Sequence, residues 1–286
     1  MSSIFDATGF SLRELPYFHQ WEAVFYVQLI WFALLVVGSL LLILINFSHL
    51  FLAGLKGFAI YFSLFCALKT AGGICSVIFL HGSTMSEGVF IASYIFNSVS
   101  LGVLTKSMFP FLEKMMKGDP TLDEKVEQRP LLHFNGSPIT PLRILTLLLT
   151  VAIITSIVGA TGISSTPVSS TTTTMFKVSA VLFTVGVLAM AACLVYVGYK
   201  YSYYSKICWI LFISVPLLIV RCSYSLASAF HGINFSSPSQ FMIIFGDYKY
   251  YAFMSLLTEG IIGVIYLGTF FWFITSHKSL SRGSSL

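Results

Sequence analysis

Seven long apolar stretches dominate this sequence and restrict what the chain can fold into. They lie at about residues 23–45, 57–80, 88–109, 141–163, 176–199, 207–230 and 250–274. A helix of about 20 apolar residues spans the hydrocarbon core of a bilayer, which is about 30 Å thick. Only 9% of the residues are charged, whereas soluble domains carry roughly a quarter. The sequence therefore predicts an all-α membrane protein, a seven-transmembrane-helix bundle whose surroundings are the lipid bilayer.

The stretches also predict how the chain is divided. We expect residues 1–22 to form an extracellular or luminal segment, 23–274 the transmembrane domain, and 275–286 a cytoplasmic tail. Between the stretches, the one sizeable hydrophilic segment is 110–140, in which charges of both signs alternate and nearly cancel. Such a pattern is typical of a solvated linker, so this segment is predicted to be a cytoplasmic loop.

The positions of lysine and arginine predict the orientation. With the N-terminus outside, eleven basic residues fall on the cytoplasmic side: Lys56, Lys106, Lys114, Lys117, Lys125, Arg129, Arg143, Lys200, Lys206, Lys278 and Arg282. Three fall outside, namely Arg13, Lys177 and Lys249. Because cytoplasmic loops carry an excess of Lys and Arg, we expect the N-terminus outside and the C-terminus in the cytosol. The chain is then a multi-pass integral protein of the plasma membrane or an endomembrane. Asn234, in an Asn-x-Ser sequence on the outer side, is the glycosylation candidate.

Cysteine and histidine do not form a recognisable metal or haem motif. All five cysteines lie inside apolar stretches, which is typical of small hydrophobic residues in helix packing rather than of disulfides. The histidines fall in loops or at helix ends, without paired ligand spacing. The basic residues are scattered rather than gathered in one patch, so no nucleic-acid partner is expected. No cofactor, metal or catalytic residue is predicted, and the oligomeric state stays open.

Three ionisable residues lie in the middle of the predicted spans: Lys69, Arg221 and Glu259. A charge at the centre of a transmembrane helix costs about 2.5–3.5 kcal/mol on insertion scales unless it is paired or hydrated. At 1.5 Å per residue, the three lie about 18–22 Å above the inner ends of their spans. Asn97, in the third stretch, reaches much the same level. We therefore expect all four residues to share one layer of the bundle.

Helical spacing predicts that this layer faces the interior. Small and polar residues line one face of each of four spans: Cys66, Lys69, Gly73 and Ser76; Ser93, Asn97 and Ser100; Ser214, Arg221, Ser225 and Ser228; Ser255, Glu259 and Gly263. Such residues on a transmembrane helix usually face its neighbours. We infer an interior polar cluster in which Glu259 pairs with Arg221 or Lys69.

Two interpretations of the cluster stay open. It is either a structural ion pair that joins the sixth and seventh spans, or a binding site. Two cations against one carboxylate leave a positive charge uncompensated if Lys69 is protonated. That excess charge would favour a small anionic ligand group or a water-filled cavity.

Five segments of this chain resemble fungal seven-helix integral membrane proteins that form a family with a domain of unknown function. They are LKTAGGI (68–74), IASYIFNSVSLGVL (91–104), IVGATGIS (157–164), PLLIVRCSYSLASAF (216–230) and LTEGIIGVIYL (257–267). The most specific parts are the Arg-x-x-Tyr-Ser motif, with Arg221, Tyr224 and Ser225, and the glutamate Glu259. Lys69 departs from the arginine typical of the family in the second span. The resemblance implies a fungal source and an external N-terminus, but no activity.

Three classes of function fit these features. A seven-helix sensor or receptor would bind a small anionic or lipophilic ligand in the polar cluster. A transporter or lipid-handling protein would use spans 1–3 and 5–7 as parallel repeats, in which Lys69 matches Arg221 and Asn97 matches Glu259. An intramembrane enzyme would use Glu259 as a general acid, a role that an adjacent cation opposes by favouring the ionised carboxylate.

Overall fold

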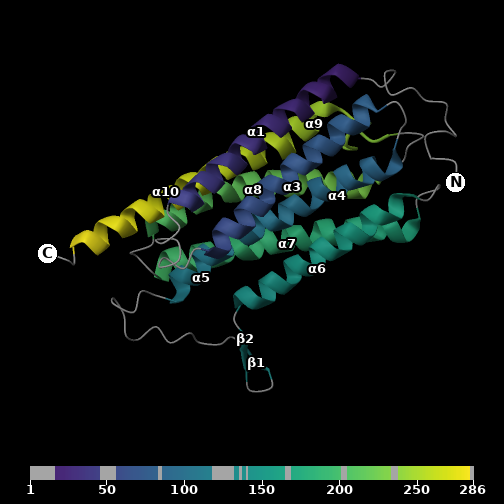
Figure 1. The fold of residues 1–286 in the computed structure, drawn as a ribbon. Coiled ribbons are helices and arrows are strands. Elements are labelled where there is room, and N and C mark those ends of the chain that lie inside the picture. The colour runs from purple at the N-terminus through teal and green to yellow at the C-terminus, as the bar shows by residue number, and fades with distance from the viewer. Residues whose placement is uncertain are drawn as a thin grey trace.

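A computed structural model describes residues 17–45, 56–82, 86–117, 132–134, 137–139, 141–164, 169–200, 205–232 and 238–283. Within these residues, seven helices are long and apolar enough to cross a membrane. The predicted all-α, seven-helix class of a multi-pass membrane protein is therefore confirmed. Figure 1 shows the long helices running side by side, with the start of α1 and the end of α10 at opposite ends of the bundle.

The helices coincide with the seven apolar stretches. Six of the spans are α1 (Phe18–Ile45), α3 (Lys56–His81), α4 (Glu87–Ser107), α6 (Pro141–Thr161), α7 (Ser170–Lys200) and α8 (Ser205–His231). The seventh consists of α9 (Tyr248–Tyr251), the π-helix η4 (Ala252–Leu257) and α10 (Thr258–Gly283). The remaining elements are a short helix α5 (Phe109–Lys117), a 3₁₀ turn η2 (Gly162–Ser164), and an antiparallel hairpin of β1 (Leu132–Phe134) and β2 (Ser137–Ile139).

The seven spans form a closed ring. Each long helix packs against the helices before and after it in the chain, and α10 packs on both α8 and α1. Figure 1 shows α1 and α10 lying together along one side of the bundle, with α6 at the opposite side. A ring of this kind encloses one shared interior, into which each helix can direct one face.

The pattern of exposure in α1 shows how the sequence separates the interior from the lipid-facing surface. Trp21, Phe25 and Phe32 follow one another at intervals of about one or two turns, and each is at most 1% exposed. Between them, Ile30 and Leu34 are 57% and 63% exposed. Both faces are apolar, because the bilayer offers no water to either of them. Helix packing rather than hydropathy therefore decides which residues turn inward.

The two helices that carry Arg221 and Glu259 each contain a feature that is unusual inside a regular α-helix. α8 contains Pro216, which has no backbone N–H to donate and disturbs the turn before it. The seventh span changes to π-helix over η4, and Glu259 follows this stretch after one residue. Isolated π turns within α-helices are rare and occur frequently at functional sites. The irregularities thus lie within about two turns of the buried charges.

Candidate functional site

The carboxylate of Glu259 lies at the centre of the bundle between two cations. Arg221 Nε donates to Glu259 Oε1 at 2.5 Å, and Lys69 Nζ forms an ion pair with Glu259 Oε2. Lys69 and Glu259 are fully buried, and Arg221 is 4% exposed. Both oxygens of the carboxylate are therefore engaged by cations. The sequence predicts that Glu259 pairs with either Arg221 or Lys69, and in the structure it contacts both.

Asn97 joins the same cluster from α4. Its Oδ1 accepts a hydrogen bond from Lys69 Nζ at 3.2 Å, and its backbone carbonyl accepts one from Arg221 Nη2 at 3.4 Å. A Cβ atom on Gly72 would come within 3.1 Å of the Asn97 amide, so this glycine allows α3 to approach α4 closely. Four helices thus bring Lys69, Asn97, Arg221 and Glu259 into one contact network.

Two further members of the cluster were missed from the sequence. Gln28 of α1 donates from Nε2 to the Lys69 carbonyl at 2.9 Å and to Asn97 Oδ1 at 3.0 Å. The Tyr251 hydroxyl lies 2.7 Å from Gln28 Oε1 and 2.9 Å from Asn97 Oδ1. Gln28 is a single amide in an apolar run, so no periodic signal in the sequence points to it. Tyr251 lies near the end of its span, where tyrosine is typical of the membrane interface.

Tyr224 and Ser225 surround the guanidinium of Arg221. Ser225 Oγ accepts a hydrogen bond from Arg221 Nη1 at 2.5 Å, and the Tyr224 ring centre lies 5.5 Å from the guanidinium carbon. The Tyr224 hydroxyl points away from this contact and donates to the Phe241 carbonyl at 3.0 Å. The glycosylation candidate, Asn234, lies outside the described residues.

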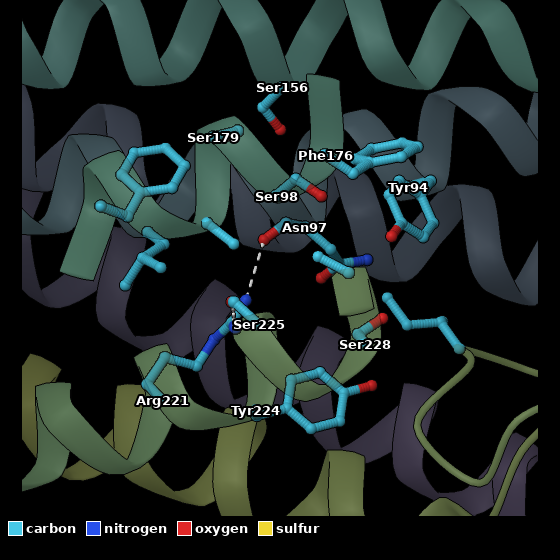
Figure 2. Close-up of a pocket in the computed structure, with 15 residues that line it drawn as sticks. Tyr94, Asn97, Ser98, Ser156, Phe176, Ser179, Arg221, Tyr224, Ser225 and Ser228 are labelled. Carbon is cyan, nitrogen blue, oxygen red and sulfur yellow. Dashed lines mark hydrogen bonds between the residues drawn. The ribbon is translucent and has the colours of Figure 1, made fainter. Parts of the chain in front are cut away.

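A pocket opens beside Arg221, between α4, α6, α7 and α8. Its polar wall includes five serines, namely Ser98, Ser156, Ser179, Ser225 and Ser228. Leu101, Phe176 and Phe183 contribute apolar surface. The centres of water-sized molecules can occupy a volume of about 50 Å³ in this pocket. One water needs about 10–15 Å³ by this measure, so the space holds about three to five waters or a ligand of that size. Figure 2 shows Ser156 and Ser179 across the pocket from Arg221 and Tyr224.

Arg221 is the charged residue of the cluster that reaches this pocket. Neither Lys69 nor Glu259 belongs to its lining. A guanidinium has five N–H donors, and in the described residues three of these have acceptors, on Glu259, Ser225 and Asn97. Two N–H groups of a buried cation are therefore left for a partner that the described protein atoms do not supply. Buried donors without acceptors are costly.

The cluster holds two basic side chains and one carboxylate, so it carries an excess positive charge when Lys69 is protonated. Lys69 and Arg221 face a single carboxylate, and the charged groups that act on Lys69 are Glu259 and Arg221. On the side of α1, the amide of Gln28 fills the space beside Lys69. On the side of α7, small residues such as Ser179 and Ala180 leave the space beside Arg221 open as the pocket. The excess positive charge is thus adjacent to the available volume.

Other side chains give no alternative centre among the described residues. No group of three or more His, Cys, Asp or Glu side chains there is arranged to hold a metal ion. The five cysteines are free. Glu259 is held by two cations and is absent from the pocket lining, an arrangement that does not support a role as general acid toward a molecule in the pocket.

Comparison with known proteins places the chain in a family. No curated protein and no solved structure matches it. A family model described as a domain of unknown function, DUF7702, matches residues 18–273, which include all seven membrane-spanning helices and the whole cluster. The fungal source implied by the sequence resemblance stays a prediction. The chain belongs to the family of proteins with the DUF7702 domain of unknown function.

Proposed function

We propose that this membrane protein is a receptor-like seven-helix protein that binds a small anion, or a small ligand with an anionic group, in the pocket beside Arg221. One observation carries the proposal. A guanidinium with two unused N–H groups lines a serine-rich pocket, within a cluster of two cations and one carboxylate. An anion in the pocket would accept those hydrogen bonds and would balance the charge.

Lys69 has an indirect part in this proposal. It lies behind Glu259 and does not line the pocket. By neutralising Glu259 it leaves the positive charge of Arg221 available to a ligand. Without Lys69, the remaining pair of Arg221 and Glu259 would be neutral as a unit. Lys69 therefore acts as a positioning residue that sets the charge of the site rather than contacting the ligand.

The size of the pocket limits the ligand. A cavity of about 50 Å³ is smaller than the cavity of about 150 Å³ that holds benzene in an engineered protein. Halides and carboxylates with one or two carbons therefore fit the pocket. The serine hydroxyls would donate to the anion, and Phe176 and Phe183 would contact a short apolar group.

The proposal is tested by the thermal stability of the purified protein in detergent. The unfolding temperature is measured in chloride, formate and acetate, with gluconate as the large reference anion at constant ionic strength. A ligand that binds the folded state raises the unfolding temperature with its concentration. We expect small anions to stabilise the parent protein. Arg221→Gln should abolish this response, since Lys69 and Glu259 remain as a balanced pair.

The matched control is Lys249→Gln, which removes one positive charge from an exposed position. This variant should retain the full response to small anions. A parent protein whose unfolding temperature is the same in gluconate and in all three small anions would refute the proposal. Equal responses in Arg221→Gln and Lys249→Gln would also refute it, since the anion would then bind elsewhere.

Transport is the second candidate, and the pairing of the cluster favours it. Lys69 on the second span donates to Asn97 on the third, and Arg221 on the sixth donates to Glu259 on the seventh. Across the two triplets, Lys69 contacts Glu259 and Arg221 contacts the Asn97 carbonyl. A parallel repeat of spans 1–3 and 5–7 would make Lys69 equivalent to Arg221 and Asn97 equivalent to Glu259, so it would produce this reciprocal pattern of contacts. Repeat interfaces hold the substrate sites of many transporters. Flux of the stabilising anion into proteoliposomes would support transport, and binding without flux would support a receptor.

The orientation of the chain is part of the proposal. The excess of Lys and Arg in the loops assigned to the cytoplasmic side supports an orientation with the N-terminus outside and the C-terminus in the cytosol, in the plasma membrane or an endomembrane. The pocket would then lie nearer the outer side, since Tyr94, Phe176 and Ser228 on its wall come from the ends of their helices that meet the start of α1.

A further inference from the structure

Residues 238–247, here called the lid segment, directly precede α9 and pack into the end of the bundle. Met242, Ile243, Ile244 and Phe245 are each at most 8% exposed, an unusual degree of burial for a connecting segment. The Phe245 ring packs edge-on against Phe90 of α4, with 5.8 Å between the ring centres. The lid segment is therefore part of the packed interior rather than an external loop.

Two hydrogen bonds tie the lid segment to the bundle. Trp21 Nε1 of α1 donates to the Gly246 carbonyl at 3.1 Å. The Tyr224 hydroxyl donates to the Phe241 carbonyl at 3.0 Å. Tyr224 also lies against the guanidinium of Arg221, as described above. One of the two ties is thus made by a residue of the ligand pocket itself.

The backbone of the lid segment is strained at its centre. Ile244 has a φ of 73°, a left-handed conformation that β-branched residues rarely adopt. A Cβ atom on Gly246 would lie 2.5–2.7 Å from three backbone carbonyls, so only glycine fits the turn that follows. Strained conformations persist where surrounding contacts impose them, and they gather at ligand clamps and switch regions. The contacts of the lid segment hold it in a shape that it would leave if they loosened.

We infer that the lid segment is the movable wall through which the ligand enters, and that Ile243 limits the size of the ligand. Ile243 lines the pocket together with Tyr224 and Ser228. Opening the lid segment withdraws this side chain and relaxes Ile244, whereas closing it completes the pocket around the anion. That the entering ligand is a small anion rests on the proposed binding function. The movement of the lid segment itself can be measured without a ligand.

The experiment measures how fast a cysteine at position 243 reacts with a hydrophilic maleimide in detergent. Ile243→Cys is compared with Gln240→Cys, an exposed position in the same lid segment, and the parent chain gives the background of the native cysteines. Tyr224→Phe then removes one tie without changing the shape of the ring. We expect it to speed labelling at position 243 about fivefold, the effect of losing about one hydrogen bond. Tyr26→Phe, on α1, is the matched control.

The inference predicts that Ile243→Cys reacts more slowly than Gln240→Cys and that Tyr224→Phe accelerates the first only. If Tyr224→Phe does not fold, Trp21→Phe removes the other tie and should act in the same way. Equal rates at positions 243 and 240, or a rate at 243 that neither variant changes, would overturn the inference. Saturating formate should slow labelling at 243. Acceleration by the variants with no effect of formate would uphold the movable lid while counting against the proposed anion site.

Discussion

The proposed function depends on the two N–H groups of Arg221 that have no acceptor among the described residues. The contact of Arg221 with Glu259 explains why an arginine is tolerated in an apolar span. The ion pair between Arg221 and Glu259 alone would be enough to join the sixth and seventh spans. Lys69 adds a second cation on the same carboxylate. In the proposed function, an anion in the pocket beside Arg221 balances the extra positive charge.

The first residue-scale prediction concerns the carboxylate. Glu259→Gln leaves two buried cations without a counter-charge, so we expect a loss of about 3–5 kcal/mol in the free energy of unfolding. The measurement is denaturant unfolding in mixed micelles. Glu87→Gln, at the partly exposed start of α4, is the control for the change of side chain and should alter stability little.

A double variant separates charge from contact. Adding Lys69→Met to Glu259→Gln removes one of the two uncompensated cations, so the double variant should recover part of the lost stability. The two changes are expected to be non-additive because the side chains touch. A double variant that is less stable than Glu259→Gln by the full effect of Lys69→Met would contradict this account of the charges.

At the scale of elements, the π-helix η4 sets the direction of Glu259. A π turn accommodates more residues per turn than an α-helix, so it changes the rotational position of everything that follows. Tyr251 precedes η4 and Glu259 follows it, yet both face the same cluster, one bonded to Gln28 and the other to Arg221 and Lys69. The irregular turn is therefore a means of directing two distant residues to one interior face.

This leads to a prediction for a deletion. Phe253 lies within η4 and is 64% exposed. Deleting it would let the stretch close as α-helix, in which seven steps of about 100° each still bring Glu259 to within about 20° of the direction of Tyr251. The ion pairs and the Tyr251 hydrogen bonds can then both persist. We expect an unfolding temperature close to that of Phe253→Ala, which keeps the number of residues; a much lower value would show that η4 has no such role.

Sequence reasoning was most successful where one physical rule dominates. Hydropathy located the seven spans, and the cost of burying charge identified Lys69, Arg221 and Glu259 as members of one layer. It missed Gln28, because a single amide in an apolar run has no periodic signal. It also missed the π-helix and the packed lid segment, since neither follows from hydropathy or helical spacing.

At the scale of the whole molecule, the closed ring brings residues from five helices to one point. Gln28, Lys69, Asn97, Arg221 and Glu259 come from α1, α3, α4, α8 and α10. The sequence indicates which residues avoid lipid, but the order of helices around the ring decides which of them meet. Here each long helix packs beside its neighbours in the chain, so the first and seventh spans also meet.

The predicted orientation is tested on the whole molecule in cells. Gln240 and Arg143 are exposed residues at opposite ends of the bundle, and each is replaced by cysteine in turn. With the N-terminus outside, an impermeant maleimide should label Gln240→Cys in intact cells and Arg143→Cys only after permeabilisation. The parent chain supplies the background of native cysteines. The reverse pattern of labelling would invert the topology that the basic residues predict.

The proposed function requires that one excess positive charge in the cluster be available to a small anion. The most direct test compares the unfolding temperatures of the parent protein and of Lys69→Met as gluconate is replaced by formate at constant ionic strength. Lys69 does not line the pocket, so this variant changes the charge of the site without removing a contact with the ligand. We expect formate to stabilise the parent in a saturable manner and to leave the unfolding temperature of Lys69→Met unchanged. A response in Lys69→Met as large as that of the parent would contradict it.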